Sequence, residues 1–482
     1  MTERETEFFT QENSLSILLN LEEGQTPFPW QKRLLKNFLK NESVCAIDIP
    51  TGLGKTSVMA IWLAARSLGA SLPRRLVYVV DRRAVVDQAT EQAEKLRDII
   101  AQHPQIAKAI GLTKKRLPIS TLRGQHIDNR EWLEDPSIPA IIVGTIDMVG
   151  SRLLFSGYGV SPKMRPYHAG FLGVDTLVVL DEAHLVPAFE DLLRTIEQEQ
   201  KVFGPRDPEL RQRIPPFRLL TLSATGRKSG DCMLSLSEED WEHPVAKKRL
   251  CAPKILEIAF PGNPAEETRP ESAITASEGE PSFAKEESDG EEKTGGAGKK
   301  GKDKYDMSEE LARKAWEVTH QGTDPVRCLV FCDKREDAQK VAQALKKMGN
   351  LSKKSKKSKE NSSDERTIDV ELFVGGRRAM ERTRARDRLA ELGFLAGTHV
   401  TPPRTAFLVA TSAGEVGVDL DADHMVCDVV AWERMIQRLG RVNRRGNGNA
   451  RVIVVMDRKA PQEKENFWQA IKKLLDALQN AK

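Results

Sequence analysis

The sequence predicts an α/β protein with two parallel sheets in tandem, each wrapped by helices. Short apolar runs alternate along the chain with segments of helical periodicity, which is typical of parallel α/β architecture. Polar and glycine-rich motifs follow several of these runs directly, and the carboxyl ends of parallel strands are where such sheets bind ligands. The predicted strands are 44–49, 76–80, 140–143, 177–180 and 219–222 in the first half, and 328–331, 370–374, 406–410, 425–430 and 452–455 in the second.

Composition divides the chain into five parts. Its 482 residues are enough for several domains, each with its own core. Between residues 262 and 304 the only large apolar side chains are Ile274 and Phe283, so this segment buries too little surface to offset its ordering entropy. We predict an N-terminal extension at 1–24, a first domain at 25–258, a disordered linker at 259–308, a second domain at 309–458 and a C-terminal helix at 459–482.

Overall properties exclude several classes of protein. The 74 Lys and Arg residues nearly balance the 70 Asp and Glu residues, so the net charge of +4 does not itself indicate a polyanion partner. No apolar run approaches the roughly 18 residues that span a bilayer, so we expect no membrane contact. The six cysteines are scattered without a Cys-x-x-Cys pair, which indicates reduced thiols rather than disulfides or a zinc site. We therefore expect a cytoplasmic protein, and a monomer.

A phosphate-binding turn is the first chemical motif. An apolar strand at 44–49 is followed by a turn at 50–54 and by a helix that opens at Lys55. Backbone N–H groups and the helix dipole at such a helix N-terminus attract phosphate oxygens. We expect Lys55 to reach the β- and γ-phosphates of ATP and Thr56 to hold Mg²⁺. The predicted turn residues that contact the nucleotide are Thr51, Gly52 and Gly54.

Two carboxylates end the predicted strand at 177–180. We expect Asp181 to join the Mg²⁺ shell and Glu182 to polarise the attacking water. His184 would connect the γ-phosphate region to neighbouring loops. The hydroxyls of Ser223 and Thr225, at the end of the next apolar strand, would relay that contact.

The second half supplies residues that would complete the nucleotide site. Gly417 permits close approach of the backbone to a ligand, and Asp419 can accept hydrogen bonds from ribose or from a neighbouring motif. Gln437, Arg441 and Arg444 are spaced i, i+4 and i+7, which predicts one face of a helix. Arginine suits phosphate because its planar fork binds in a bidentate manner and stays charged. The alternative is a basic surface helix without a ligand.

An aromatic and an amide precede the phosphate-binding turn. Gln31 can pair with the adenine edge while an aromatic neighbour in the run Phe28-Pro29-Trp30-Gln31 packs on the ring. The alternative for Phe28 is a structural aromatic cap on the helix that follows.

Short loops at strand ends are candidates for nucleic-acid contact. Such loops can hold a phosphodiester backbone through amides and arginines without reading bases. A Lys-rich segment at 351–366 is either a solvated loop or a weak polyanion contact. The predicted contacts are Arg82, Arg123, Thr145, Gly376, Arg377 and Thr411.

Taken in order, these motifs resemble those of the superfamily 2 DEAH-box helicases over roughly residues 25 to 457. The turn from Pro50 to Thr56 has the Pro-Thr-Gly-x-Gly-Lys-Thr form of that superfamily, and residues 181–184 read Asp-Glu-Ala-His. More narrowly, residues 143–159, 180–186 and 415–419 resemble the helicase part of the CRISPR-associated helicase-nuclease of type I systems. The long interdomain segment is similar to that of subtype I-G, formerly I-U.

The resemblance implies two RecA-like P-loop domains and a motor that uses ATP and Mg²⁺. It also implies recruitment to an RNA-guided CRISPR surveillance complex and movement 3′ to 5′ along the displaced DNA strand. The family's HD nuclease requires a His-Asp dipeptide, and none of the eight histidines is followed by Asp. We therefore expect the nuclease on a separate chain or in a missing domain.

Three functions are compatible with the sequence. The first is an ATP-dependent translocase and helicase for single-stranded DNA in CRISPR interference. The second is a DEAH-type RNA helicase, because backbone contacts distinguish DNA from RNA only through the 2′-hydroxyl. The third is a nucleic-acid-binding scaffold without ATPase activity, which the intact set of nucleotide-site residues disfavours.

Overall fold

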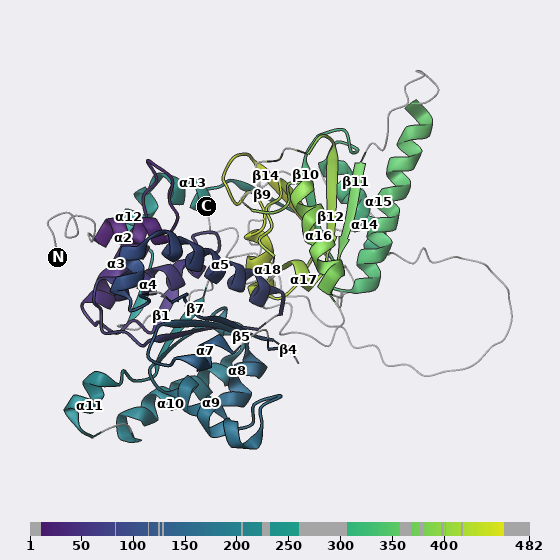
Figure 1. The fold of residues 1–482 in the computed structure, drawn as a ribbon. Helices are drawn as coiled ribbons and strands as arrows, with labels where there is room; N and C mark the ends of the chain where they lie inside the picture. Colours follow the sequence, from purple (N-terminus) through teal and green to yellow (C-terminus); the bar gives the residue numbers. More distant parts are fainter. Residues whose placement is uncertain are drawn as a thin grey trace, which may run out of the picture.

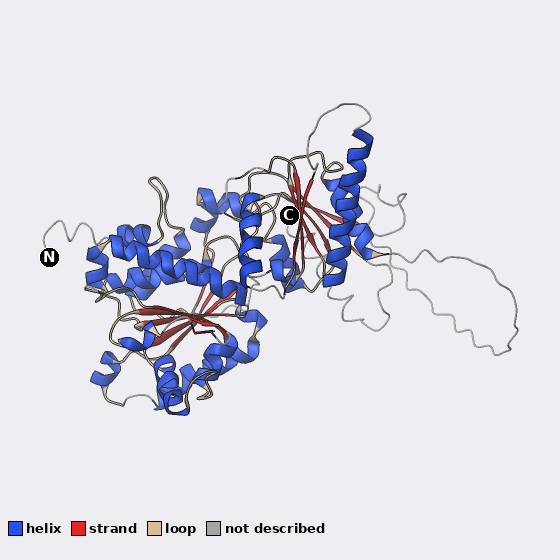
Figure 2. Cartoon of the chain, turned by 45° about the vertical axis from the view of Figure 1, so that its right-hand side comes forward, coloured by secondary structure: helices blue, strands red, loops and turns tan. Residues whose placement is uncertain are grey.

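Two helix-covered sheets form the molecule (Figure 1). The computed structural model describes residues 11–81, 83–113, 115–123, 126–127, 130–203, 206–223, 232–259, 306–356, 368–375, 379–396, 400, 402–415 and 418–456. Helices cover both faces of each sheet (Figure 2). This architecture confirms the predicted fold class.

The first sheet has eight strands in the order β4-β3-β5-β2-β6-β7-β1-β8, and all its pairs are parallel except β3 with β4. Its strands are β1 (Ala46–Asp48), β2 (Arg75–Val80), β3 (Ile119–Arg123), β4 (His126–Ile127), β5 (Ala140–Thr145), β6 (Thr176–Leu180), β7 (Arg218–Ser223) and β8 (Met233–Ser235). Its helices are α2 (Gln11–Leu18), α3 (Pro29–Leu39), η1 (Lys55–Ser57), α4 (Val58–Ser67), α5 (Arg83–Gln102), α6 (Pro104–Ala109), α7 (Glu131–Glu134), α8 (Ile146–Leu153), η2 (Pro162–Met164), α9 (Arg165–Gly173), η3 (Ala183–Leu185), α10 (Pro187–Phe203), α11 (Pro208–Arg213), α12 (Glu238–Glu242) and α13 (Pro244–Leu250).

The second sheet has six strands in the order β11-β12-β10-β13-β14-β9, all parallel. Its strands are β9 (Lys254–Ala259), β10 (Arg327–Phe331), β11 (Ile368–Phe373), β12 (Thr405–Ala410), β13 (His424–Asp428) and β14 (Ala450–Val455). Its helices are α14 (Met307–Val318), α15 (Arg335–Lys356), α16 (Ala379–Glu391), α17 (Ser412–Glu415) and α18 (Trp432–Leu439). All ten predicted strands are present, whereas β3, β4, β8 and β9 were not predicted.

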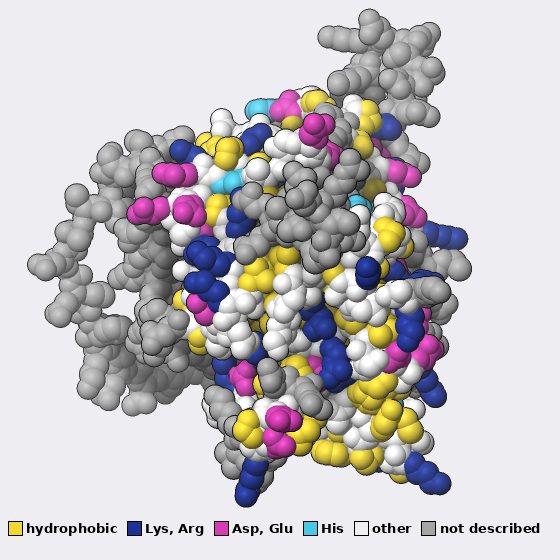
Figure 3. Space-filling view, turned by 60° about the vertical axis from the view of Figure 1, so that its left-hand side comes forward, with side chains coloured by type: hydrophobic (Ala, Val, Ile, Leu, Met, Phe, Trp, Pro, Cys, Tyr) yellow, Lys and Arg dark blue, Asp and Glu magenta, His cyan; other side chains and the backbone are white. Residues whose placement is uncertain are grey.

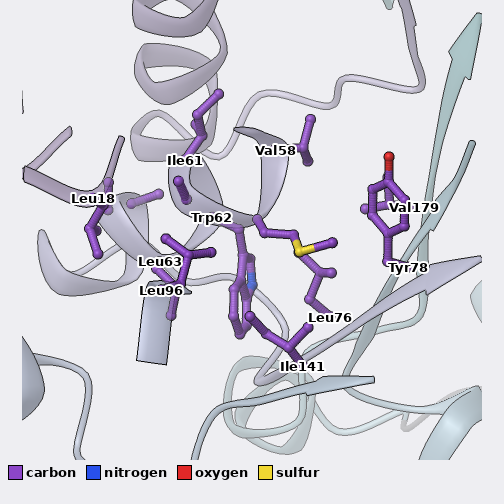
Figure 4. Packing of buried hydrophobic residues seen from close by; sticks show 14 of the residues in the cluster. Leu18, Val58, Ile61, Trp62, Leu63, Leu76, Tyr78, Leu96, Ile141 and Val179 are labelled. Atoms are coloured by element: carbon purple, nitrogen blue, oxygen red, sulfur yellow. The ribbon is translucent and has the colours of Figure 1, made fainter. Parts of the chain in front are cut away.

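Helix α4 anchors the core of the first domain directly behind the phosphate-binding turn. Nine of its ten residues are buried, because it lies between the sheet and the helices α2 and α3. Trp62 is fully buried, its indole N–H donates to the carbonyl of Pro73 (3.0 Å), and Figure 4 shows it beside Leu76 and Ile141. This packing fixes the helix whose N-terminus would face the nucleotide.

The predicted domain boundary at residue 258 differs from the structure. β9 pairs in parallel with β14 of the second sheet, with Lys254 opposite Ala450. The described chain ends at Ala259 of β9 and resumes at Asp306, whose side chain caps α14, a helix packed on β13 and β14. Both flanks of the predicted linker therefore belong to the second domain, and the chain crosses between domains before β9. Residues 260–305 themselves, the first ten residues and the predicted C-terminal helix lie outside the described residues.

The prediction that all six cysteines are reduced was wrong for two of them. Cys45 and Cys232 form a disulfide, with Cα atoms 5.4 Å apart and 187 residues between them in sequence. Each cysteine immediately precedes a strand, and the adjacent parallel strands β1 and β8 pair Ala46 with Met233, so the two cysteines lie side by side. The other cysteines are free thiols, and burial raises the pKa of Cys427 to about 12. Among the described helices, none is both long enough and apolar enough to cross a bilayer.

Candidate nucleotide site between the two domains

The phosphate-binding turn follows β1 and leads into η1 and α4. Gly52 and Gly54 have φ values of 94° and 74°, a left-handed conformation that side chains disfavour, which explains the two glycines. The indole N–H of Trp30 donates to the carbonyl of Leu53 (3.2 Å) and so ties the turn to α3. Lys55 and Thr56 open the helical segment, as the sequence predicts.

The two predicted catalytic carboxylates lie at the end of β6, next to this turn. The hydroxyl of Tyr78 donates to Asp181 (2.9 Å). Desolvation of the Asp181 carboxyl, followed by the nearby charge of Glu182, raises its pKa to about 6. A carboxylate that is costly to ionise in this way fits a divalent cation, whose charge would favour the ionised form.

Glu182 is the point at which the two domains meet. Lys55 Nζ lies 3.4 Å from Glu182 Oε1, and His184 Nδ1 lies 3.5 Å from Oε2. From α18 of the second domain, the side-chain amide of Gln437 donates to Glu182 Oε2 (3.1 Å). Glu182 therefore contacts two predicted site residues of the first domain and one of the second.

The two domains are packed tightly beside the phosphate-binding turn. A Cβ at Gly440 would lie 2.3 Å from Thr51 Oγ1, a distance that no side chain tolerates. Glycine at this position lets the end of α18 lie directly against the turn. Figure 1 shows α18 where the second domain meets the first.

Arg441 and Arg444 do not continue the helical face of Gln437. Helix α18 ends at Leu439 and is capped by Gly440, so both arginines lie in the turn that follows, and the prediction of one helical face was wrong. Arg441 donates to the Glu415 carbonyl (2.9 Å) and to Asp419 (3.3 Å), and Arg444 also pairs with Asp419.

Arg444 lies against the phosphate-binding turn. The Nε of Arg444 lies 3.2 Å from the place of a Cβ on Gly52. Desolvation lowers the pKa of each guanidinium to about 10, so both remain charged at neutral pH. Asp419 thus contacts a neighbouring motif, the second of its two predicted roles, and Gly417 lies outside the described residues.

Gln31 lies beside the phosphate-binding turn. Its carbonyl oxygen accepts from the backbone N–H of Phe28 (2.9 Å), and its amide donates to Ser57 Oγ (2.9 Å). Phe28 contacts the ring of His243 edge-on, at 5.1 Å between centroids. Phe28 therefore serves as a packed N-cap of α3, and Gln31 lies within reach of a nucleotide bound at the turn.

Arg249 is a residue of this site that sequence reasoning missed. It lies on α13, and its Nη1 donates to the Gly52 carbonyl (2.7 Å). Desolvation lowers its pKa, and the charge of Arg445 lowers it further. An arginine in a short basic run gives no sequence signal, because only the fold brings α13 to the turn.

The predicted nucleic-acid contacts are only partly described. Thr145 caps α8 and Thr411 follows β12, and both are buried, as is Ser223 at the end of β7. Arg123 pairs with Asp87 of α5. The predictions at Arg82, Gly376, Arg377 and Thr225 fall outside the described residues.

An exposed ion pair links α16 of the second domain to α5 of the first. Arg386 of α16 forms a two-pronged pair with Glu91 of α5, with Nη2 at 2.7 Å from Oε2, and this pair joins the two domains. Figure 3 shows one face of the molecule on which cationic, anionic and apolar side chains are interspersed. That face carries no broad area of one charge, in keeping with the near-neutral composition.

Comparison with known proteins agrees with this geometry. Residues 28–230 match the family model of DEAD/DEAH box helicases, and residues 325–447 match that of the C-terminal part of the CRISPR-associated nuclease/helicase Cas3. A curated CRISPR-associated nuclease/helicase Cas3 of Myxococcus xanthus is 37% identical over 82 residues, which are 17% of this chain and 11% of that protein.

Solved helicase structures share the fold. Cas3 of T. fusca with AMPPNP superimposes with a TM-score of 0.57 at 16% identity, over 97% of this chain and 51% of that one. The Mycobacterium smegmatis helicase Lhr, bound to single-stranded DNA and AMP-PNP, gives 0.53 at 14% identity, over 89% and 46%. The DUF1998 helicase MrfA bound to DNA gives 0.56 at 14% identity, over 96% and 53%. The chain therefore spans about half the length of these three structures.

Proposed function

We propose that this chain is an ATP-dependent translocase that unwinds DNA in type I CRISPR interference, because residues 28–230 match the DEAD/DEAH box helicases and residues 325–447 match the C-terminal part of Cas3. The observation that carries the proposal is Glu182, which Lys55 contacts from the first domain and Gln437 from the second. A hydrolytic residue shared by two domains lets hydrolysis change their relative position. A protein that moves along a strand requires this coupling between hydrolysis and the relative position of its domains.

Each residue of the site has a distinct task in hydrolysis. Lys55 exchanges Glu182 for the β- and γ-phosphates, which frees the carboxylate to orient water and accept its proton. Arg441 and Arg444 stabilise the charge that develops on the transferred phosphoryl group. Mg²⁺ held by Thr56 and Asp181 would neutralise phosphate charge. His184 and Ser223 would transmit the state of the γ-phosphate to the loops after β6 and β7, together with Thr225.

The proposed track is single-stranded DNA, with movement 3′ to 5′. Support comes from relatives, since Lhr was solved with single-stranded DNA and MrfA with DNA. The proposed partners are an RNA-guided CRISPR surveillance complex and an HD nuclease on a separate chain or in a domain beyond this sequence. We further propose that the protein acts in the cytoplasm as a monomer.

An RNA helicase is the second candidate. The DEAD-box helicase Mss116, solved with single-stranded RNA, has the same fold at a TM-score of 0.52 and 13% identity. Contacts to a sugar-phosphate backbone distinguish RNA from DNA only through the 2′-hydroxyl, so both tracks remain to be compared by experiment.

A steady-state ATPase assay with single-stranded DNA, with RNA or with neither separates these functions. We expect stimulation by DNA, and unwinding of a duplex with a 3′ single-stranded tail in preference to a 5′ tail. Stimulation by RNA alone would establish the RNA helicase. Nucleic-acid binding without any ATP hydrolysis would establish a scaffold and overturn the proposal.

A further inference from the structure

The connection between α8 and α9 exposes a group of apolar side chains. We call residues 154–167 the apolar loop. It includes the short helix η2 and the first turn of α9. Its exposed apolar residues, with their exposed fractions, are Leu154 (59%), Phe155 (60%), Tyr158 (63%), Met164 (38%) and Tyr167 (47%).

The backbone of this loop is fixed by hydrogen bonds. Fully buried Arg152 donates to the carbonyls of Met148 (2.7 Å) and Tyr158 (3.4 Å). The N–H groups of residues 156 and 157 both donate to the Ser151 carbonyl at 2.8 Å. Phe155 adopts a left-handed φ of 58°, which costs a non-glycine residue free energy. The fold therefore holds these apolar side chains in water rather than leaving them there by chance.

The charged residues within the loop are all basic. No Asp or Glu occurs between residues 148 and 174, whereas Lys163 and Arg165 lie within the loop. Lys163 is exposed and Arg165 is half-buried. Exposed aromatic rings among cations, without acidic residues, suit a polyanion with flat bases, because bases stack on the rings and phosphates pair with the cations. An apolar protein partner would not require the absence of acidic residues.

The loop continues the path along the edge of the first sheet. α8 directly follows Thr145, a predicted strand contact at the end of β5, and its eight residues span about 12 Å. In Figure 1, α8 lies directly below β5, and the chain continues from it to α9. A strand passing Thr145 therefore needs only a few more nucleotides to meet the loop.

We propose that the apolar loop is a second contact for single-stranded nucleic acid, on which bases that leave the sheet edge stack against Phe155 and Tyr158. The proposal rests on the function proposed above, since it assumes a strand at Thr145. It adds a site that lengthens the footprint and retains the strand after it has passed the two domains.

The experiment compares two oligonucleotide lengths. Oligo-dT of about 8 nucleotides would cover the sheet edges alone, and oligo-dT of about 20 would also reach the loop, given site sizes of about 4 to 16 nucleotides per module. Fluorescence anisotropy with each oligonucleotide is compared between the unchanged protein and Phe155→Ala/Tyr158→Ala. We expect the long oligonucleotide to bind about tenfold or more weakly to the variant, with binding of the short one and its ATPase stimulation unchanged.

Controls separate stacking from structure. Trp241→Ala removes an exposed aromatic of α12 outside the loop, so it should leave both affinities unchanged. Tyr158→Phe keeps the ring and should bind the long oligonucleotide normally. If the double variant fails to fold, Tyr158→Ala alone retains the carbonyl that Arg152 binds and takes its place.

Three results would overturn the inference. Equal affinity of the variant and the unchanged protein for the long oligonucleotide would exclude stacking on the loop. An equal loss for both lengths would place the effect at the sheet edge instead. A change in sedimentation with unchanged DNA affinity would identify a protein-docking surface. If the unchanged protein bound neither oligonucleotide, the proposed function itself would fail.

Discussion

The candidate nucleotide site and the surface around the Arg386–Glu91 pair, which we propose faces the strand and call the strand-facing surface, both join the two domains, but they hold their charges differently. At the nucleotide site the side chains of Gln437 and Arg441 are buried, and Glu182 is enclosed by partners from both domains. On the strand-facing surface, Arg386 and Glu91 pair with about half and a third of their side chains exposed. Removing one partner of a buried set costs several kcal/mol, whereas an exposed pair contributes about 0 to 1 kcal/mol.

This difference suits two kinds of ligand. The buried site must place a few groups with little freedom around one transition state. In the proposed function the exposed pairs would exchange with each phosphate of a moving strand, so weak pairing would be an advantage there. Substitutions should therefore have large effects in the first region and small effects in the second.

The largest expected effect is that of Arg444→Ala. Loss of an arginine supplied from the opposite domain typically lowers turnover by about 10³ or more. ATP should still bind through Lys55, as a fluorescent ATP analogue would show, while DNA-stimulated hydrolysis falls to background. Arg451→Ala, which removes an arginine of β14 that pairs with Glu257 of β9, is the matched control. Full DNA stimulation of Arg444→Ala would end the two-domain interpretation of the site.

Lys55→Ala and Glu182→Gln should separate binding from chemistry. Lys55→Ala removes the charge that holds the phosphates and should abolish nucleotide affinity. Glu182→Gln keeps that charge and loses the base, so turnover should fall by about 10² to 10⁴ with ATP affinity retained. Equilibrium binding and single-turnover hydrolysis measure the two quantities. Equal losses of affinity in both variants would contradict this division of tasks.

Glu91→Gln should slightly strengthen the binding of single-stranded DNA, in contrast to the losses of function expected above. It leaves Arg386 free to bind a phosphate, so single-stranded DNA should bind a few-fold more tightly at low salt, with the basal ATPase rate unchanged. Arg386→Gln should bind DNA a few-fold more weakly. Glu94→Gln, whose partner Arg97 lies on the same helix, is the control. Were Glu91→Gln to change basal hydrolysis severalfold, the pair would belong to the closed nucleotide site instead.

The smallest effect is expected from residues 262–304. A Gly/Ser segment of equal length should keep DNA-stimulated ATPase within about twofold, because the reach of such coils depends weakly on their sequence. The ATPase assay with single-stranded DNA measures it. A tenfold loss of DNA-stimulated ATPase would instead show that this segment is a docking element.

Much of the fold could be predicted because buried parallel strands are nearly continuous apolar runs. β2 and β12, for example, are buried at every position. β9 escaped prediction because Lys254 and Glu257 interrupt its apolar residues and only Ala259 is buried, and its partner β14 lies almost 200 residues away. β3 carries buried Ser120 and Thr121, which interrupt its apolar pattern.

Some residues of the candidate site could likewise be predicted from local sequence, and others could not. Lys55, Thr56, Asp181 and Glu182 follow strands directly, so local sequence places them. Arg249 and the Cys45–Cys232 disulfide depend on contacts between distant segments, which periodicity cannot reveal. The end of α18 was a missed local signal, because glycine commonly follows the last residue of a helix and Gly440 stands there.

Because β9 pairs with β14 of the second sheet, the chain could be divided after β9 into two fragments that associate. If the chain were cut anywhere within 260–305, the first fragment would still donate β9 to the sheet of the second, held by the ladder to β14. A second domain produced from residue 306 onward would lack that strand and leave β14 as an open edge, prone to pair with other chains. An isolated second domain should therefore begin at Lys254, and the two halves of this protein should reassemble when they are expressed as separate fragments.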